Sequence, residues 1–352
     1  MPSMRPFGPI HWILDKLPQI QQWSVLGTIA TEDRCLTAAE VIFSSRRSSD
    51  ITLLKIVDPV SAQNGFKRQV ALKIGQMESV ARTAFGSALK VPTFDLLCVE
   101  QEIGDFVSDF LLRCGDSVIV DLSAMPKRFF FPVLTLLMQS ARITNLVATY
   151  SLPERYGRVL AEDPEEWRPL PMFGGDPLSN DKTPASLIIG VGYQPLQISE
   201  ILSHIRFGSD RVKLLFPFPS IPPGFVENWK FVARIKNDWS KLRGNELPSD
   251  AIIRVPTHDA SIAFDQLVAH TNSGRAPSVV LAPFGPKPIS LAMCLLGIAR
   301  LAEGIATEIG YTQPYVYHPE YSTGSARKDG IPHVNGYCIR LMQRNLYALP
   351  GQ

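Results

Sequence analysis

Two lysines stand at equivalent points of two similar segments, each directly after a proline. Lys127 closes the segment SVIVDLSAMPK, and Lys287 closes the segment SVVLAPFGPK. Each segment opens with a short β-branched apolar run typical of a buried strand, and a long apolar helix pattern follows each lysine. A cation at a helix start opposes the helix macrodipole, and it is better tolerated where an anion binds. The spacing therefore indicates a shared negative ligand; the alternative is two surface lysines after proline turns.

The loops after the predicted first strands supply further candidate ligand-binding residues. In the first half, Thr31 offers a hydroxyl that can cap the next helix, and Arg34 offers a guanidinium that can fork onto a phosphate. In the second half, Gly192 allows close backbone approach, Tyr193 can stack on a base, and Gln194 can read a base edge. The alternatives are an ordinary cap with a surface arginine, and a tight turn.

Three residues complete the candidate ligand site, and two more are candidates for catalysis. Ser123 supplies a hydroxyl in the first lysine loop, and Gly285 and Ser290 flank Lys287 in the second. His258 and Asp259 follow a predicted strand and form a possible acid–base pair, although an N-cap by the aspartate is the commoner use of such a dipeptide. We expect no metal site, because the histidines lack partners at a metal-ligand spacing. No Walker A or GxGxxG sequence predicts a cofactor.

The first lysine loop resembles the fourth-strand loop of CARF domains, many of which carry D-[LV]-[ST]-x-x-x-K. The residues Asp121–Lys127 match this pattern, while the second loop keeps Gly285, Lys287 and Ser290 but has Ala282 in place of the acid. Two CARF-like units in one chain resemble the SAVED domain. The resemblance implies Rossmann-like folds that bind cyclic oligonucleotide messengers in prokaryotic antiviral defence, through loops after the first and fourth strands. It also implies a partner protein that supplies the effector, because no effector segment is evident.

The fold class that we expect is α/β, with two tandem Rossmann-like, doubly wound and mainly parallel sheets related by a pseudo-two-fold duplication. The strand patterns are continuously apolar, which indicates burial on both faces, and helix patterns separate them. Matched strands of the two halves lie about 160 residues apart. The expected strands are Trp23–Ile29, Ile51–Val57, Phe94–Val99, Ser117–Val120 and Asn145–Tyr150 in the first half, and Ser186–Val191, Val212–Phe216, Ala251–Val255, Ser278–Leu281 and Pro314–Tyr317 in the second.

The expected domain boundaries follow from this pattern. Residues 1–20 form a leader, 21–155 a first unit, 156–183 a linker or crossing arm rich in Pro, Gly and acids, and 184–352 a second unit that ends in a strand. The five cysteines are widely spread and lack a CxxC pair, which favours reduced thiols in a cytoplasmic protein. We expect no membrane segment, because no apolar run approaches the ~20 residues of a span. A net charge of +2 makes no case for a polymeric nucleic acid as partner.

The sequence thus supports three hypotheses of function. The first is a sensor that holds a nucleotide-type anion, such as a cyclic oligonucleotide, in the cleft between the two halves. The second is a nucleotide-cleaving enzyme on the same fold, although the loops hold no complete acid–base–nucleophile set. The third is a structural subunit of a defence complex whose cleft is vestigial. The identity of the ligand and of the partner protein does not follow from the sequence.

Overall fold

The computed structural model describes residues 5–17, 19–59, 65–157, 161–174, 186–194, 198–204, 211–220, 224–305 and 307–351. Its chain divides into two compact units. The first unit comprises Met1–Asp163 and Pro314–Leu346, and the second comprises Pro164–Gln313 and Tyr347–Gln352. The sequence-based boundaries placed residues 184–352 together in the second unit, whereas here Pro314–Leu346 returns to the first.

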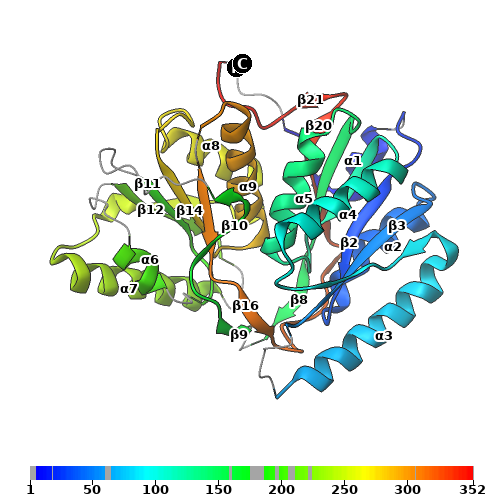
Figure 1. The fold of residues 1–352 in the computed structure, drawn as a ribbon, viewed down its shortest axis with the longest axis horizontal. Coiled ribbons are helices and arrows are strands. Elements are labelled where there is room, and N and C mark those ends of the chain that lie inside the picture. The colour runs from blue at the N-terminus through cyan, green and yellow to red at the C-terminus, as the bar shows by residue number, and fades with distance from the viewer. Residues whose placement is uncertain are drawn as a thin grey trace. The chain divides into compact units, whose positions relative to one another are not determined.

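The first unit is built on a mixed sheet whose middle is parallel (Figure 1). Its parallel strands run in the spatial order β4/β5–β3–β2–β6–β7, and two antiparallel strands, β20 and β1, continue the sheet beyond β7. The strands are β1 (Phe7–Pro9), β2 (Ser24–Ile29), β3 (Asp50–Val57), β4 (Leu89–Lys90), β5 (Thr93–Asp95), β6 (Ser117–Asp121), β7 (Asn145–Ser151), β20 (Val334–Leu341) and β21 (Arg344–Asn345), which pairs with β20.

The second unit repeats this strand order. Its parallel strands run β13–β12–β11–β14–β15, and the antiparallel strand β10 lies beyond β15. Numbered along the chain, the parallel strands of both units therefore read 3-2-1-4-5. The strands are β10 (Arg168–Gly174), β11 (Ser186–Gly190), β12 (Val212–Pro217), β13 (Ile252–Val255), β14 (Val279–Pro283) and β15 (Glu308–Tyr311).

Helices alternate with the strands in both units, as in other α/β folds. In the first unit they are α1 (Ile10–Lys16), the short η1 (Asp33–Cys35), α2 (Thr37–Ser44), α3 (Lys67–Phe85), η2 (Gly86–Ala88), α4 (Glu100–Arg113) and α5 (Lys127–Gln139). In the second unit they are α6 (Ile198–His204), α7 (Gly224–Arg243), η4 (Ser249–Ala251), α8 (Ala260–Ala269) and α9 (Lys287–Ala302).

Three small two-stranded sheets complete the described structure. β8 (Pro153–Tyr156) pairs with β17 (Ser322–Ser325), β9 (Ala161–Pro164) with β16 (Pro314–Tyr317), and β18 (Arg327–Lys328) with β19 (Ile331–Pro332). The segment expected to be a linker thus contributes β9 and the sheet strand β10. The chain passes from one unit to the other after Asp163, within β9, and again after Gln313, directly before β16.

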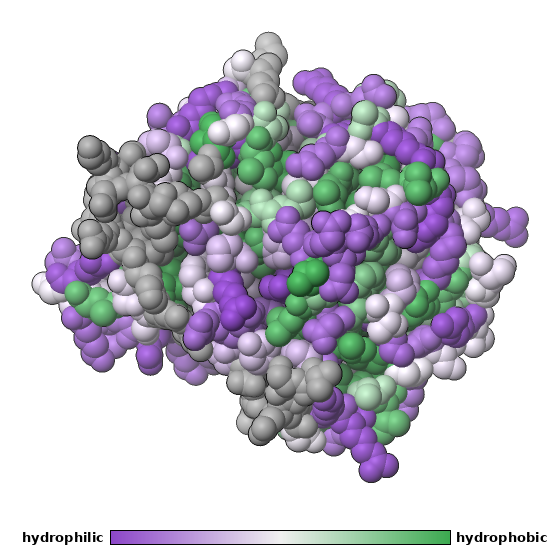
Figure 2. All heavy atoms as spheres, in the orientation of Figure 1, coloured by the Kyte–Doolittle hydropathy of each residue, from purple (hydrophilic) through white to green (hydrophobic). Residues whose placement is uncertain are grey.

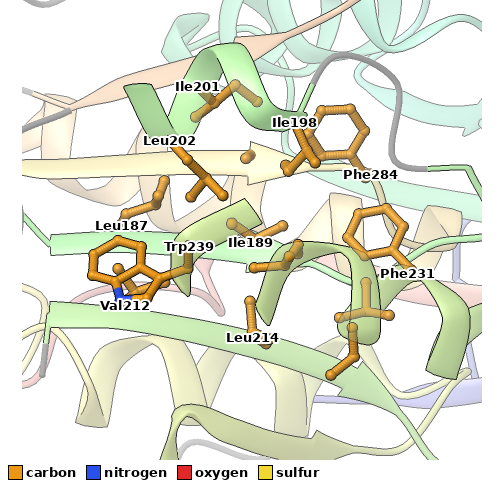
Figure 3. Close-up of a cluster of buried hydrophobic side chains, with 14 of the residues drawn as sticks. Leu187, Ile189, Ile198, Ile201, Leu202, Val212, Leu214, Phe231, Trp239 and Phe284 are labelled. Atoms are coloured by element: carbon orange, nitrogen blue, oxygen red, sulfur yellow. The ribbon is translucent and has the colours of Figure 1, made fainter. Parts of the chain in front are cut away.

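Burial of the strands on both faces explains their continuously apolar sequences. Every residue of β2, β6, β7, β11 and β14 is buried. In the second unit, α6 and α7 cover one face of the sheet, and Figure 3 shows Trp239, Ile201 and Phe231 of these helices packed on Leu187 and Leu214. The parallel α/β architecture predicted from sequence is therefore confirmed.

Two predicted strands differ from the structure. The fifth strand of the second sheet is β15 (Glu308–Tyr311) rather than Pro314–Tyr317, which forms β16 in a separate two-stranded sheet. The third strand of the first sheet ends at Asp95 instead of Val99, because the Leu97 amide donates to Oδ1 of Asp95 at 2.7 Å and closes a turn.

The surface in view in Figure 2 is mostly polar, and apolar side chains lie on it in small groups. All five cysteines are buried and free. Within the described ranges, no helix is long and apolar enough to cross a membrane. The same residues contain no cluster of three His, Cys, Asp or Glu side chains suited to a metal ion.

Candidate functional site

The prolines of the two proline–lysine loops have similar backbone dihedrals and lie at equivalent places in their sheets. Pro126 precedes α5 with φ −58° and ψ 149°, and Pro286 precedes α9 with φ −59° and ψ 158°. Lys127 and Lys287 are the first residues of these helices, which follow β6 and β14, the fourth parallel strand of each unit. In open α/β sheets, ligands bind beyond the carboxyl ends of the strands beside the topological switch point. With the order 3-2-1-4-5, that point lies between the first and the fourth strand.

The two lysines differ in their exposure to solvent. Lys127 is 9% exposed, whereas Lys287 is half-buried. Burial lowers the pKa of Lys127 to about 7, because an ammonium group loses hydration in the protein interior. A lysine with this pKa changes charge near neutral pH. Perturbed groups of this kind gather at functional sites, which makes Lys127 a candidate on physical grounds.

A buried hydrogen-bond network forms the rest of the β6–α5 loop. The hydroxyls of Ser123 and Thr149 donate to Oδ1 of Asp121 at 2.6 and 3.0 Å, and the Ser151 amide donates to Oγ of Ser123 at 2.7 Å. Burial raises the pKa of Asp121 to about 6, against the lowering effect of these hydrogen bonds. Ser123 is thus engaged within the protein, where it ties the ends of β6 and β7 together.

Arg34 lies in the loop after β2, and the protein itself supplies its anionic partner. Nε and Nη2 donate to Oε2 of Glu32 at 2.9 and 2.7 Å, and Nη1 donates to the Ser151 carbonyl at 2.8 Å. The guanidinium carbon lies 5.2 and 5.9 Å from the ring centroids of Tyr150 and Tyr156. Arg34 is only 2% exposed. Because buried guanidinium groups need a charged partner, Glu32 fills the role that the sequence assigned to a ligand phosphate.

A segment distant in sequence covers the same loop. Ser322 of β17 donates its hydroxyl to Oε2 of Glu32 at 2.5 Å, and the Gly324 amide donates to Oδ2 of Asp33 at 3.0 Å. Thr31 is buried nearby. The N-cap positions of η1 and α2 are Glu32 and Leu36, so the expected cap by Thr31 is not observed. The sequence gives no local signal of these contacts, which join residues about 290 positions apart.

Glycines bring the equivalent loops of the second unit into close backbone contact. A Cβ on Gly192 would lie 2.1 Å from the Phe284 carbonyl oxygen, and a Cβ on Gly285 would lie 3.2 Å from the Val191 oxygen. The loops after β11 and β14 therefore meet through their backbones at the switch point. Tyr193 and Gln194 follow directly and are half-buried.

Ser290 and Asp259 have structural roles. Ser290 is fully buried, and its hydroxyl donates to the Gly285 carbonyl at 3.2 Å, which holds the loop against α9. Asp259 is the N-cap of α8: its Oδ1 accepts from the amides of Ser261 and Ile262 at 2.8 and 3.0 Å. His258 is half-buried beside it. This geometry matches the helix-capping use of the His-Asp pair that the sequence left open.

The sequence did not single out the aromatic residues that follow β12. Phe218, Phe225, Val226 and Trp229 are 53%, 59%, 57% and 46% exposed, although they are large and apolar. They lie at the carboxyl end of β12 and on the start of α7, at the same edge of the sheet as Tyr193. The sequence feature that could have indicated them is the run PFPSIPPGFVENW, in which large apolar residues stand among proline, serine and glycine residues typical of turns.

No protein-family model matches this sequence, and comparison with curated proteins gives no significant match.

Proposed function

We propose that the chain binds a nucleotide-type anionic ligand at the carboxyl ends of its parallel sheets, with Lys127 and Lys287 as the phosphate-binding residues. In this proposal the two units arose by duplication of one Rossmann-like unit. The resemblance to CARF and SAVED domains names the ligand class, a cyclic oligonucleotide, and the setting, a prokaryotic defence system with a separate effector protein.

One observation carries the proposal: a helix starts with Pro-Lys after the fourth parallel strand of both units. The two prolines differ by only 1° in φ and 9° in ψ. The helix macrodipole gives each helix start a partial positive charge, and the lysine adds a full one when it is protonated. A phosphate group suits either of these helix starts, each beside the switch point of its own unit.

The loops after the first strands contribute differently in the two units. In the second unit, Gly192 and Gly285 keep backbone atoms close to the switch point, and Tyr193 and Gln194 offer stacking and hydrogen bonding to a base. In the first unit, Glu32 holds Arg34, and an incoming phosphate would have to displace that carboxylate. Phosphate binding by the first unit therefore depends on Lys127.

A second candidate function has an observation of its own. The switch-point loop of the first unit is filled by Glu32, Ser123 and Ser322, which satisfy each other and the neighbouring backbone. In detail, Ser322 donates to Glu32, whereas Ser123 donates to Asp121 and accepts from the Ser151 amide. A site filled in this way suits a structural subunit that kept the fold and lost the ligand. Stable association with a partner protein, without any response to nucleotides, is the behaviour that this candidate predicts.

Thermal unfolding in the presence of linear and cyclic nucleotides tests the first proposal. A ligand that binds only the native state stabilises it by about 2.7 kcal/mol at a hundred times its dissociation constant. We expect a cyclic oligonucleotide to raise the melting temperature, and inorganic sulfate at matched ionic strength to have a smaller effect. Unchanged melting with every nucleotide contradicts the sensor and favours the structural subunit.

A further inference from the structure

The aromatic residues at the carboxyl end of β12 form a group with an unusual position. Phe218 follows the strand, and Phe225 and Trp229 lie one helical turn apart on α7. Each exposes about half or more of its surface. Large apolar side chains that share an exposed surface mark binding sites more often than single ones do. This group lies at the edge of a parallel sheet where ligands of such folds bind.

Contacts within the protein fix the Trp229 ring and the end of β12. The Trp229 ring packs on the buried Phe216 with centroids 4.5 Å apart, so one of its faces is fixed. Ser220 donates to the Pro217 carbonyl at 2.9 Å and accepts from the Asn228 amide at 3.0 Å, which ties the end of β12 to the first turn of α7. The Trp229 ring therefore needs little ordering on binding a planar ligand.

Charge and hydrogen-bonding groups accompany the rings. The guanidinium carbon of Arg254 lies 5.5 Å from the Phe218 ring centroid. Gly224 lets Tyr193 approach α7, because a Cβ there would lie 3.0 Å from Cε1 of Tyr193 and 3.1 Å from Nδ2 of Asn228. Asn228 is 1% exposed, and its Oδ1 accepts no hydrogen bond from any residue that the structure describes. A buried acceptor without a donor is uncommon in a folded protein.

We propose that Phe218, Phe225 and Trp229, with Tyr193 and Arg254, form a stacking site for a nucleobase. Aromatic rings stack on any base, and a guanidinium beside them adds attraction for base and phosphate. This site lies after the second strand of the unit, separate from the lysine loops. It rests on the proposed function in one respect: the base belongs to the nucleotide whose phosphate binds at Lys287 of the same unit.

The test compares adenosine 5′-monophosphate with ribose 5-phosphate, which lacks the base. Trp229→Ala and Phe225→Ala should each weaken binding of the nucleotide by about tenfold, as loss of one stacking ring does, and leave ribose 5-phosphate unchanged. The matched control is Leu242→Ala, an equally exposed apolar residue at the far end of α7 that should change neither affinity. The nucleotide should also quench the tryptophan fluorescence of the parent, and less so that of Trp229→Phe.

The outcomes separate this site from the lysine loops. Nucleotide binding that is equal in the parent, Trp229→Ala and Phe225→Ala overturns the stacking site, even if ribose 5-phosphate shows that phosphates bind. Adenosine that binds through Trp229 while ribose 5-phosphate does not bind supports the stacking site and contradicts the phosphate role of the lysines. Self-association of the parent that Trp229→Ala abolishes, without any base binding, also overturns the proposal and assigns the rings to a contact between copies.

Discussion

Arg34 and Glu32 form a buried ion pair in which two guanidinium nitrogens share one carboxylate oxygen, with Nε and Nη2 of Arg34 at 2.9 and 2.7 Å from Oε2 of Glu32. Ser322 reaches the same oxygen from β17. Hydrogen bonds thus link Asp121 to Ser322 by way of Ser123, the backbone N–H and C=O of Ser151, Arg34 and Glu32. This network fills the switch point of the first unit, where the equivalent position of the second unit is lined by glycine backbone.

The ion pair predicts a large stability effect of a small substitution. Glu32→Gln keeps the shape but leaves the Arg34 charge buried without its anion, so we expect the free energy of unfolding to fall by about 3–5 kcal/mol. Denaturant unfolding of the first unit measures it. The control is Glu227→Gln, the same change in an exposed pair with Lys230, which should cost about 0–1 kcal/mol. Equal losses for both variants would contradict the structural role of the pair.

The sequence predicted the scaffold better than it predicted the contacts at the loops. Continuously apolar strands and the helices between them follow from burial on both faces, a local property that the residues display. The role of Arg34 depends on its contacts with Glu32 and with the distant Ser151 carbonyl, and the fifth strand of the second unit depends on Trp167. The sequence of that strand, EIGY, is not typical of a buried strand, because its glycine makes room for an indole ring. A Cβ on Gly310 would lie 2.1 Å from Cζ2 of Trp167.

The same limit applies to the candidate site residues. The equivalence of Lys127 and Lys287 was visible because both follow a strand, a loop and a proline in order along the chain. The network of Ser123 with Ser151 joins separate strands, and no spacing rule describes it. The aromatic residues after β12 were not predicted as site residues, because a proline-rich run is typical of a turn. Their solvent exposure depends on the folded structure and cannot be derived from the sequence.

Substitution of Gly192 by alanine should create a local packing defect. In Gly192→Ala the new Cβ would lie 2.1 Å from the Phe284 carbonyl oxygen, so the loops after β11 and β14 must separate. We expect a loss of about 2 kcal/mol or more in unfolding free energy, since overpacking typically costs 1–3 kcal/mol. The control is Gly104→Ala within α4, where a Cβ meets no atom within 4 Å and helix propensity favours alanine. Thermal melts in which Gly192→Ala is as stable as Gly104→Ala would refute the close approach.

The raised pKa of Asp121 should make the stability of the protein depend on pH. Burial raises its pKa from 3.8 to about 6, so the native state binds more protons than the unfolded state between these values. The free energy of unfolding should therefore fall, through this group, as pH rises from about 4 to 6. Asp121→Asn should remove that slope and stabilise the protein above pH 6 by up to about 3 kcal/mol. Denaturant titrations from pH 4 to 8 test this, and an asparagine variant that keeps the parental slope rules Asp121 out as its source.

Lys127 predicts that ligand binding takes up protons. Its pKa is about 7 in the free protein because of burial, and a bound phosphate favours the charged form and raises that pKa. Affinity for a cyclic oligonucleotide should therefore decrease as pH rises above 7. The ligand does not contribute, because its phosphodiesters stay ionised in this range. Lys127→Arg, which is always charged, should bind with little change between pH 7 and 9. Parallel pH profiles for the two proteins would exclude Lys127 as the titrating group.

The central claim is tested most directly by calorimetric titration of cyclic adenylates into the parent, Lys127→Ala and Lys287→Ala. A charge-assisted phosphate contact contributes ~1–3 kcal/mol, so each variant should bind about tenfold or more weakly while melting as a folded protein. Lys67→Ala is the matched control, because Lys67 also begins a helix, α3. That helix follows β3, the second parallel strand, which does not border the switch point. This variant should bind like the parent. Binding that is unchanged in both Lys127→Ala and Lys287→Ala would contradict the account.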